Sequence, residues 1–166
     1  MRIQKITTLA LYTTLALGIY GIESALPPLV PIPGIKPGLA NIITLALLHR
    51  YTYKDTLLVL LSRILLSTLL FGQAMSLLYS LAGGLACLLL MVPVSRLLCR
   101  KHIYITSIMG ALAHNLAQLL VAFCITKVSG VLVYCPFLIL SAIITGCFTG
   151  LCCHFLLKYL PDQAIR

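Results

Sequence analysis

Long apolar segments separated by short polar breaks run through this chain. The segments 104–126 and 131–157 contain no Asp, Glu, Lys or Arg, and each exceeds the roughly 20 residues that an α-helix needs to cross a bilayer. Of the 166 residues, 61% are hydrophobic and 9% are charged, whereas globular proteins carry roughly 25% charged residues. This excludes a water-soluble fold, and the high hydrophobicity also excludes disorder. The sequence predicts an integral membrane protein that sits in a lipid bilayer.

The breaks between the apolar segments predict an all-α, polytopic protein with six transmembrane helices. We expect one transmembrane domain, residues 1–166. Residues 23–37 hold five of the eight prolines, and proline removes N–H donors and fixes φ. We therefore expect a loop there, with spans at about 6–22, 38–49, 56–71, 75–98, 104–126 and 131–157.

The positive charges predict the orientation of the spans. With an even number of spans, nine of the twelve Lys and Arg residues fall on the side of both termini: Arg2, Lys5, Arg50, Lys54, Arg96, Arg100, Lys101, Lys158 and Arg166. The opposite side holds Lys36 and Lys127, and Arg63 lies inside a span. Because cytoplasmic loops are enriched in Lys and Arg, both termini should be cytoplasmic and the proline-rich loop should lie on the outer face.

Several function classes are poorly supported by the sequence. The net charge of +9 follows the charge bias of membrane proteins, and no basic run is interleaved with aromatics, so we expect no nucleic-acid partner. The seven cysteines include no C-x-x-C pair, and the adjacent Cys152, Cys153 and His154 would point about 100° apart on a helix, so no metal is expected. No cofactor or catalytic constellation is recognisable, and we expect no enzyme.

Polar residues at similar depth in two different spans form the main candidate site. Arg63 lies eight residues after Asp55, which places it about 12 Å into the membrane. His114 lies about 15 Å deep when counted from Tyr104 and shares a helix face with Gln118, with Asn115 on the flank. Buried charges in membranes are by default functional, so these four residues are candidate substrate-binding residues. The alternative is a hydrogen-bonded cluster that only holds helices together.

Two other segments contain candidate binding residues. Glu23, Lys36 and Asn41 lie in or next to the outer loop, which we expect to act as a lid over a substrate cavity because long loops in compact chains are usually functional or disordered. An ordinary surface connection is the alternative. In the first span, Ala10, Thr14 and Gly18 recur every four residues. Small residues at this spacing allow close helix approach, either by a partner protein or by a helix of the same bundle.

Three stretches of the sequence resemble a known family. They are ESALPPLVPIPGIKPGLANIITL, which includes P-x-P-G-x-K-x-G-L-A-N from Pro31 to Asn41, RILLSTLLFG, and GALAHNLAQLL, which includes H-N-x-x-Q from His114 to Gln118. They resemble the small bacterial membrane proteins called Gx transporters or heptaprenyl diphosphate synthase component I, which are similar to substrate-binding S components of energy-coupling factor (ECF) transporters. The resemblance covers almost the whole chain and implies a multi-pass protein of the bacterial cytoplasmic (inner) membrane.

The resemblance also implies an architecture and a function. In S components six helices enclose a substrate cavity near the outer face, the first loop acts as a lid, and small-residue motifs dock a T subunit and two ATPases. The comparable docking face here is Ala10, Thr14 and Gly18. Our leading expectation is therefore the substrate-binding component of an uptake transporter for a small molecule.

The second half of the family's name leads to the alternative expectation. Prenyl chain elongation needs paired aspartate-rich motifs that hold magnesium and diphosphate, whereas this chain has two isolated aspartates, Asp55 and Asp162. A catalytic role in that reaction is therefore not expected. The alternative is a noncatalytic accessory or scaffold subunit linked to heptaprenyl diphosphate, quinone or flavin-dependent redox metabolism.

Overall fold

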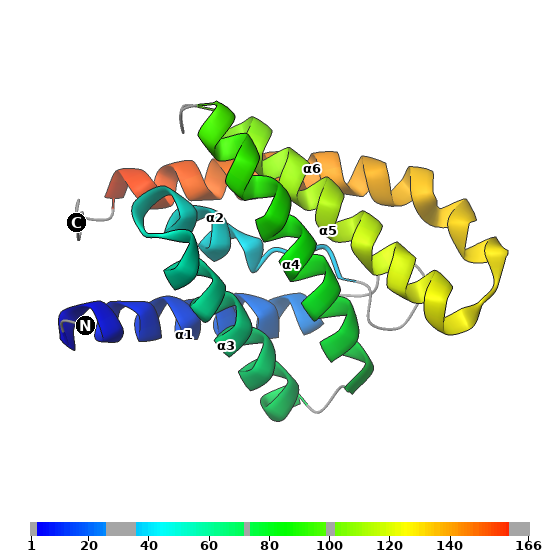
Figure 1. The fold of residues 1–166 in the computed structure, drawn as a ribbon, viewed down its shortest axis with the longest axis horizontal. Helices are drawn as coiled ribbons and strands as arrows, with labels where there is room; N and C mark the ends of the chain where they lie inside the picture. The colour runs from blue at the N-terminus through cyan, green and yellow to red at the C-terminus, as the bar shows by residue number, and fades with distance from the viewer. Residues whose placement is uncertain (1–2, 26–35, 72–73, 99–101, 160–166) are drawn as a thin grey trace.

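The computed structural model describes residues 3–25, 36–71, 74–98 and 102–159, and these residues form a bundle of helices. Figure 1 shows the order of the elements along the chain. Six α-helices and a short 3₁₀ helix are formed: α1 (Ile3–Ala25), α2 (Asn41–Arg50), α3 (Tyr53–Phe71), α4 (Ala74–Leu97), α5 (Ile103–Thr126), η1 (Ser129–Tyr134) and α6 (Cys135–Tyr159). The described part contains no strand, so the all-α expectation is confirmed there.

The outer surfaces of the bundle are apolar. On α6, the side chains of Leu140, Ile144 and Phe148 are all more than half exposed, and they are spaced by four residues along one face of the helix. Four segments are long and apolar enough to cross a membrane: Ile3–Ala25, Met75–Leu97, Ile103–Thr126 and Ser129–Tyr159. Exposed apolar side chains on several such helices define a multi-pass membrane protein.

Helix α2 lies in the interior of the bundle and is shorter than the span we expected at 38–49. Its ten residues extend about 15 Å, half the thickness of the hydrocarbon core. It contacts α1, α3, α4 and α6, and Leu45 and Leu47 are completely buried. A helix that is apolar all round is suited to such a position. Figure 1 shows α2 in cyan among the other helices.

Helix α1 is longer than expected. We placed its end at residue 22 and began the loop at Glu23, but the helix continues to Ala25, so the expectation of a loop at 23–25 is wrong. The buried residues of α1 explain the extension, because they continue at helical spacing through Ala16 and Tyr20 to Glu23. Residues 26–35, which make up most of the expected lid, lie outside the described residues.

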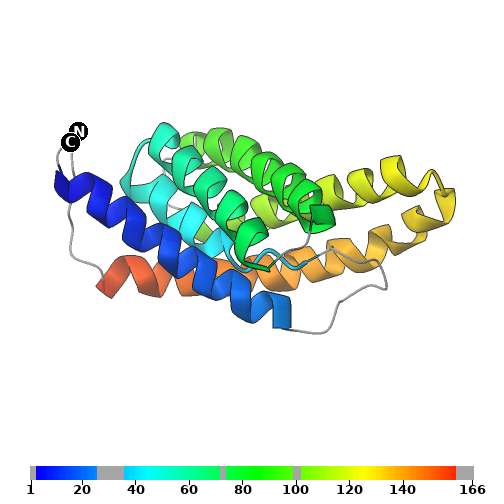
Figure 2. The ribbon, with the colours of Figure 1, turned by 90° about the horizontal axis from the view of Figure 1, so that it is seen from below.

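Polar contacts gather helix ends at one end of the bundle. Lys5 Nζ near the start of α1 lies 2.7 Å from Asp55 Oδ1 in the first turn of α3. Arg50 at the end of α2 donates to the carbonyl of Leu157 on α6 at 2.6 Å. Figures 1 and 2 show the start of α1 and the end of α6 at this same end.

Candidate functional site

A network of side chains joins the entrance of α2 to α5 in the interior of the bundle. The Nδ2 of Asn41, the first residue of α2, lies 3.2 Å from His114 Nδ1 on α5. Gln118 Nε2, one turn further along α5, lies 3.0 Å from His114 Nε2, and Gln118 Oε1 accepts from the backbone N–H of Lys36 at 3.3 Å. All three side chains are buried. The expected shared face of His114 and Gln118 is therefore observed, and Asn41 is added to it from a second helix.

The donor and acceptor roles in this network determine the orientation of the Asn41 amide. A neutral imidazole accepts at one ring nitrogen and donates at the other. Gln118 must keep Oε1 toward the N–H of Lys36, so its Nε2 donates to His114 Nε2. His114 then carries its proton on Nδ1, and the contact with Asn41 becomes a hydrogen bond when Asn41 presents Oδ1 there. In this orientation the N–H₂ of Asn41 takes the buried position at which the structure places Oδ1 without a partner among the described residues.

Two glycines hold the His114 ring closely. Gly38 has a positive φ of 79°, and a Cβ on it would lie 2.9 Å from the Cδ2 and Nε2 atoms of His114. A Cβ on Gly83 of α4 would lie 2.7 Å from His114 Cε1. Both distances are shorter than real Cβ contacts, so only glycine allows the loop and α4 to approach the imidazole this closely. The ring is thereby fixed in orientation.

Glu23 ties the end of α1 to the entrance of α2. Its carboxylate accepts a hydrogen bond from the backbone N–H of Gly38 and also faces the N–H groups of Leu39 and Ala40. These are the free donors that precede a helix, where a carboxylate is favourable. The chain thus closes on itself between residues 23 and 38, and the buried carboxylate has its hydrogen-bonding capacity largely occupied by the backbone.

Arg63 on α3 is buried without the hydrogen bonds that a buried arginine usually makes. Its exposed fraction is 4%, and its Nε has no hydrogen-bond partner among the described residues. The guanidinium is attracted by the Glu23 carboxylate, but the two groups form no ion-pair contact in the part of the chain described. His114 also lies within electrostatic range of Arg63. A buried Arg usually has hydrogen bonds to a carboxylate or carbonyl, so this arrangement leaves donors available.

Lys36 completes the cluster together with a residue that the sequence did not single out. Its Nζ lies 4.0 Å from the centroid of the Tyr20 ring and has no hydrogen-bond partner among the described residues. Tyr20 is itself held by a 2.7 Å hydrogen bond to Ser76 on α4. The signal that marks Tyr20 is its position on the buried face of α1, four residues after Ala16 and three before Glu23.

Asn115 has a different environment from its neighbour His114. Its Nδ2 donates to the carbonyl of Leu138 on α6 at 2.9 Å, and its Oδ1 is buried without a partner among the described residues. The hydrogen bond fixes α5 against α6, which also meet through a 2.6 Å contact between the hydroxyls of Ser107 and Thr149. The structure therefore brings Arg63, His114, Gln118, Asn41, Lys36 and Glu23 to one region and turns Asn115 toward α6.

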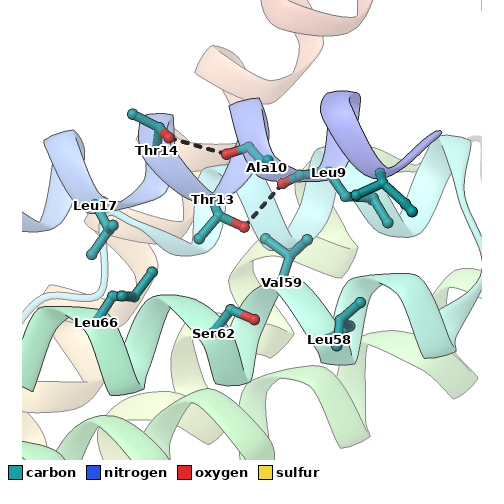
Figure 3. A pocket seen from close by; sticks show the side chains of 10 residues that line it. Leu9, Ala10, Thr13, Thr14, Leu17, Leu58, Val59, Ser62 and Leu66 are labelled. Carbon is teal, nitrogen blue, oxygen red and sulfur yellow. Dashed lines mark hydrogen bonds between the residues drawn. The ribbon is translucent and has the colours of Figure 1, made fainter. Parts of the chain in front are cut away.

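The small residues of α1 lie on an exposed face. Ala10, Thr14 and Gly18 are all exposed, and a Cβ on Gly18 would meet nothing within 4 Å. Ala10 and Thr14 line a groove of about 360 Å³ between α1 and α3, which Figure 3 shows from close by. The hydroxyl of Thr14 donates to the carbonyl of Ala10 within the same helix at 3.1 Å. The face is therefore effectively apolar, and all three of its residues stay exposed in the part of the chain that the structure describes.

Fold and site together define the class of the protein. It is a multi-pass helical membrane protein with a buried cluster that is rich in cations and donors. The cluster lies where residues 36–40, which lead back into the bundle ahead of α2 and are called the re-entering segment below, meet α3 and α5. Within the described residues, no group of three or more His, Cys, Asp or Glu side chains is placed to hold a metal ion.

The chain belongs to the heptaprenyl diphosphate synthase component I family, whose model matches residues 12–156. No curated protein and no solved structure was found to match it. The match includes every residue of the polar cluster, and it confirms the family that the sequence motifs indicated.

Proposed function

We propose that this chain is the substrate-binding membrane component of an ECF-like uptake transporter for a small molecule, in the bacterial cytoplasmic membrane. The observation that supports this best is the buried Arg63, whose Nε has no partner among the described residues. A guanidinium that only held helices together would be hydrogen-bonded to them. Here Nε is left without an acceptor among the described residues, as expected for a site that completes its contacts with a ligand.

In this proposal the segment 36–41 forms the movable side of the site. Lys36 and Asn41 contact Gln118 and His114, and Glu23 fixes the base of the segment through Gly38. Residues 36–50, an irregular stretch followed by α2, would together make the second of six membrane crossings. Irregular backbone at membrane depth is tolerated where it lines a cavity or is buried in protein.

Energy for uptake would come from a docked module of a T subunit and ATPases, because the chain contains no Walker motif. The exposed face of Ala10, Thr14 and Gly18 on α1 is the proposed docking surface. Nothing lies within 4 Å of the Cβ position of Gly18, so we expect a substitution there to leave the fold of the chain unchanged.

The test is to isolate the tagged full chain from native membranes in mild detergent and identify its partners by mass spectrometry. We expect a polytopic membrane subunit together with ATPases, and we expect Gly18→Leu to release them without reducing the folded amount. Leu15→Phe, on an exposed neighbouring position of α1, is the matched control and should retain them. Retention of the ATPases by Gly18→Leu would contradict docking through this face.

The family description supports a second candidate function. "Heptaprenyl diphosphate synthase component I" names one component of an enzyme, so the chain would instead be a noncatalytic accessory or scaffold subunit in that metabolism. The same isolation separates the two functions. A prenyl diphosphate synthase subunit that co-purifies in place of ATPases would favour the accessory role and overturn the transporter proposal.

A further inference from the structure

Two cationic donors at the candidate site have no hydrogen-bond partner among the described residues: Nε of Arg63, and Nζ of Lys36, which faces the Tyr20 ring. Asn41 adds its N–H₂ when its amide is turned so that Oδ1, the atom left without a partner, accepts from His114. Arg63 and Asn41 are more than nine-tenths buried. A buried donor without an acceptor is unfavourable, and more so when it is charged, so these donors in one region indicate that an acceptor-rich group belongs there.

The charges of the cluster limit what that group is. Arg63 and Lys36 contribute two positive charges, and Glu23 contributes one negative charge whose oxygens are directed to the backbone at Gly38. His114 is neutral in the only proton arrangement that satisfies both of its amide neighbours. The excess is one positive charge. In a low-dielectric interior an uncompensated charge is strongly unfavourable, so a single negative charge completes the site.

We propose that the cluster of Arg63, Lys36 and Asn41 binds a small molecule through one monoanionic, carboxylate-type group. A planar carboxylate offers two acceptor oxygens that match the guanidinium fork, and its remaining lone pairs can accept from Lys36 and Asn41. A diphosphate group carries more negative charge than the cluster can neutralise, and no metal-holding group of side chains is found among the described residues. The inference rests on the proposed substrate-binding function and specifies the chemistry of its ligand.

The first experiment identifies what the protein carries. The full chain is purified from native membranes in mild detergent, and any bound small molecule is detected by native mass spectrometry, released and fragmented. A molecule that has one carboxylate or similar monoanionic group supports the proposal, whatever its net charge. A molecule with no anionic group, or with a polyanionic one, overturns it, while leaving the substrate-binding function in place, because that function requires only that a molecule is bound.

If the protein is empty, defined anions decide the question. The thermal unfolding temperature is followed with sodium acetate, sodium chloride, sodium pyrophosphate at equal ionic strength, and acetamide, which is the neutral isostere of acetate. We expect acetate to raise the unfolding temperature with concentration and acetamide to leave it unchanged. Equal effects of chloride and acetate would reduce the site to an inorganic anion site, and a larger effect of pyrophosphate would indicate a polyanion. Either result, or no effect of any anion, overturns the proposal.

Variants test whether acetate raises the unfolding temperature by binding at this cluster. Arg63→Met should weaken the acetate response by about tenfold or more in midpoint concentration, the loss expected for one charge-assisted hydrogen bond. Arg96→Met, which removes an exposed arginine near the end of α4, is the matched control and should respond as the wild type does. Should Arg63→Met fail to fold, Arg63→Lys keeps the charge and removes the planar fork, and it should still weaken the response. An unchanged response in a folded Arg63 variant overturns the proposal.

Whether the transporter function fails is decided separately, by the isolation of partner subunits. A chain that binds acetate but co-purifies with a synthase subunit would keep the ligand class and lose the transport role. A chain that co-purifies with ATPases but carries a molecule with no anionic group would keep the transport role and lose the ligand class.

Discussion

At the scale of single residues, Gly38 shows how tightly the re-entering segment is joined to the site. Its φ of 79° lies in the left-handed region that costs other residues about 1–2 kcal/mol. A Cβ there would also lie 2.8 Å from Asn41 Nδ2 and 2.9 Å from His114 Cδ2. Backbone conformation and packing therefore both require glycine at this position.

The corresponding prediction is that Gly38→Ala destabilises the protein by about 2–4 kcal/mol, from the left-handed backbone and from overpacking against His114. Thermal unfolding in detergent measures it. Gly18→Ala is the control: it lies inside α1 with nothing within 4 Å of the added Cβ, and a helical Gly-to-Ala change is neutral or slightly stabilising. Equal stability of the two variants would mean that the segment around Gly38 is not packed on His114.

Replacement of Arg63 and of Gln118 by apolar residues of similar size should change the stability of the empty protein to different extents. Arg63→Met removes a buried charge whose Nε has no partner among the described residues, so the empty protein should lose little or no stability. Gln118→Leu leaves the N–H of Lys36 and a ring nitrogen of His114 without their partner, which should cost about 1–3 kcal/mol. Unfolding temperatures of the two empty variants give the comparison. Strong destabilisation by Arg63→Met would identify Arg63 as structural.

At the scale of elements, the helix boundaries were predictable where short polar breaks interrupt the apolar pattern. The spans expected at 75–98 and 104–126 agree with α4 and α5 to within a residue or so at each end. Other bounds differ more, as where the span expected at 131–157 is divided into η1 and α6. Two of the departures involve contacts between distant segments: the carboxylate of Glu23, which belongs to α1, accepts from the backbone N–H of Gly38, fifteen residues later, and α2, which is shorter than expected, is packed among other helices. Local periodicity contains neither contact.

The candidate site was predictable to a similar extent. The four-residue spacing of His114 and Gln118 places them on one helix face, which sequence alone indicates. Their meeting with Asn41 depends on α2 starting inside the bundle, and the role of Tyr20 depends on Lys36 lying over its ring. Such contacts between distant segments follow from the tertiary fold and leave no pattern in a single sequence.

The start of α3 carries a prediction at this scale. Asp55 pairs with Lys5 of α1 at 2.7 Å and forms a capping box with Thr52, whose hydroxyl accepts from the N–H of Asp55 while its N–H donates to the carboxylate. Asp55→Ala loses the carboxylate half of the capping box and the ion pair. It should cost about 1–2 kcal/mol, whereas Lys5→Ala, which loses only a partly exposed pair, should cost less than about 1 kcal/mol.

Thermal unfolding of Lys5→Ala, of Asp55→Ala and of the variant with both changes measures the coupling energy between these two side chains, and so between α1 and α3. Lys54→Ala, an exposed neighbour of Asp55 on α3, is the control and should stay within about 0.5 kcal/mol of the wild type. If Lys5→Ala lowers the free energy of unfolding as much as Asp55→Ala does, the predicted contribution of Asp55 to capping α3 is wrong.

At the scale of the whole molecule, the topology depends on whether the re-entering segment and α2 complete one crossing. Residue 36 onward leads into the interior, α2 continues to Arg50, and Arg50 then meets the end of α6 at Leu157. Counted as one crossing, these residues make the total even. The nine Lys and Arg residues assigned to the inner side then all face the cytoplasm, as the positive-inside rule requires.

A reporter that is active only in the cytoplasm tests this arrangement at three positions. Fused after Arg166, or after Thr52 between α2 and α3, it should be active, and inserted at Ser129 at the start of η1 it should be inactive. A reporter active only outside the cytoplasm is the control and should give the reciprocal pattern. The fusion after Thr52 is the decisive one, because a ten-residue α2 is too short to cross the roughly 30 Å hydrocarbon core alone. Activity there means that residues 36–40 and α2 cross together. Inactivity would place the link between α2 and α3 outside, put the two termini on opposite sides and break the charge asymmetry, and the lid and its site would then have to be reassigned.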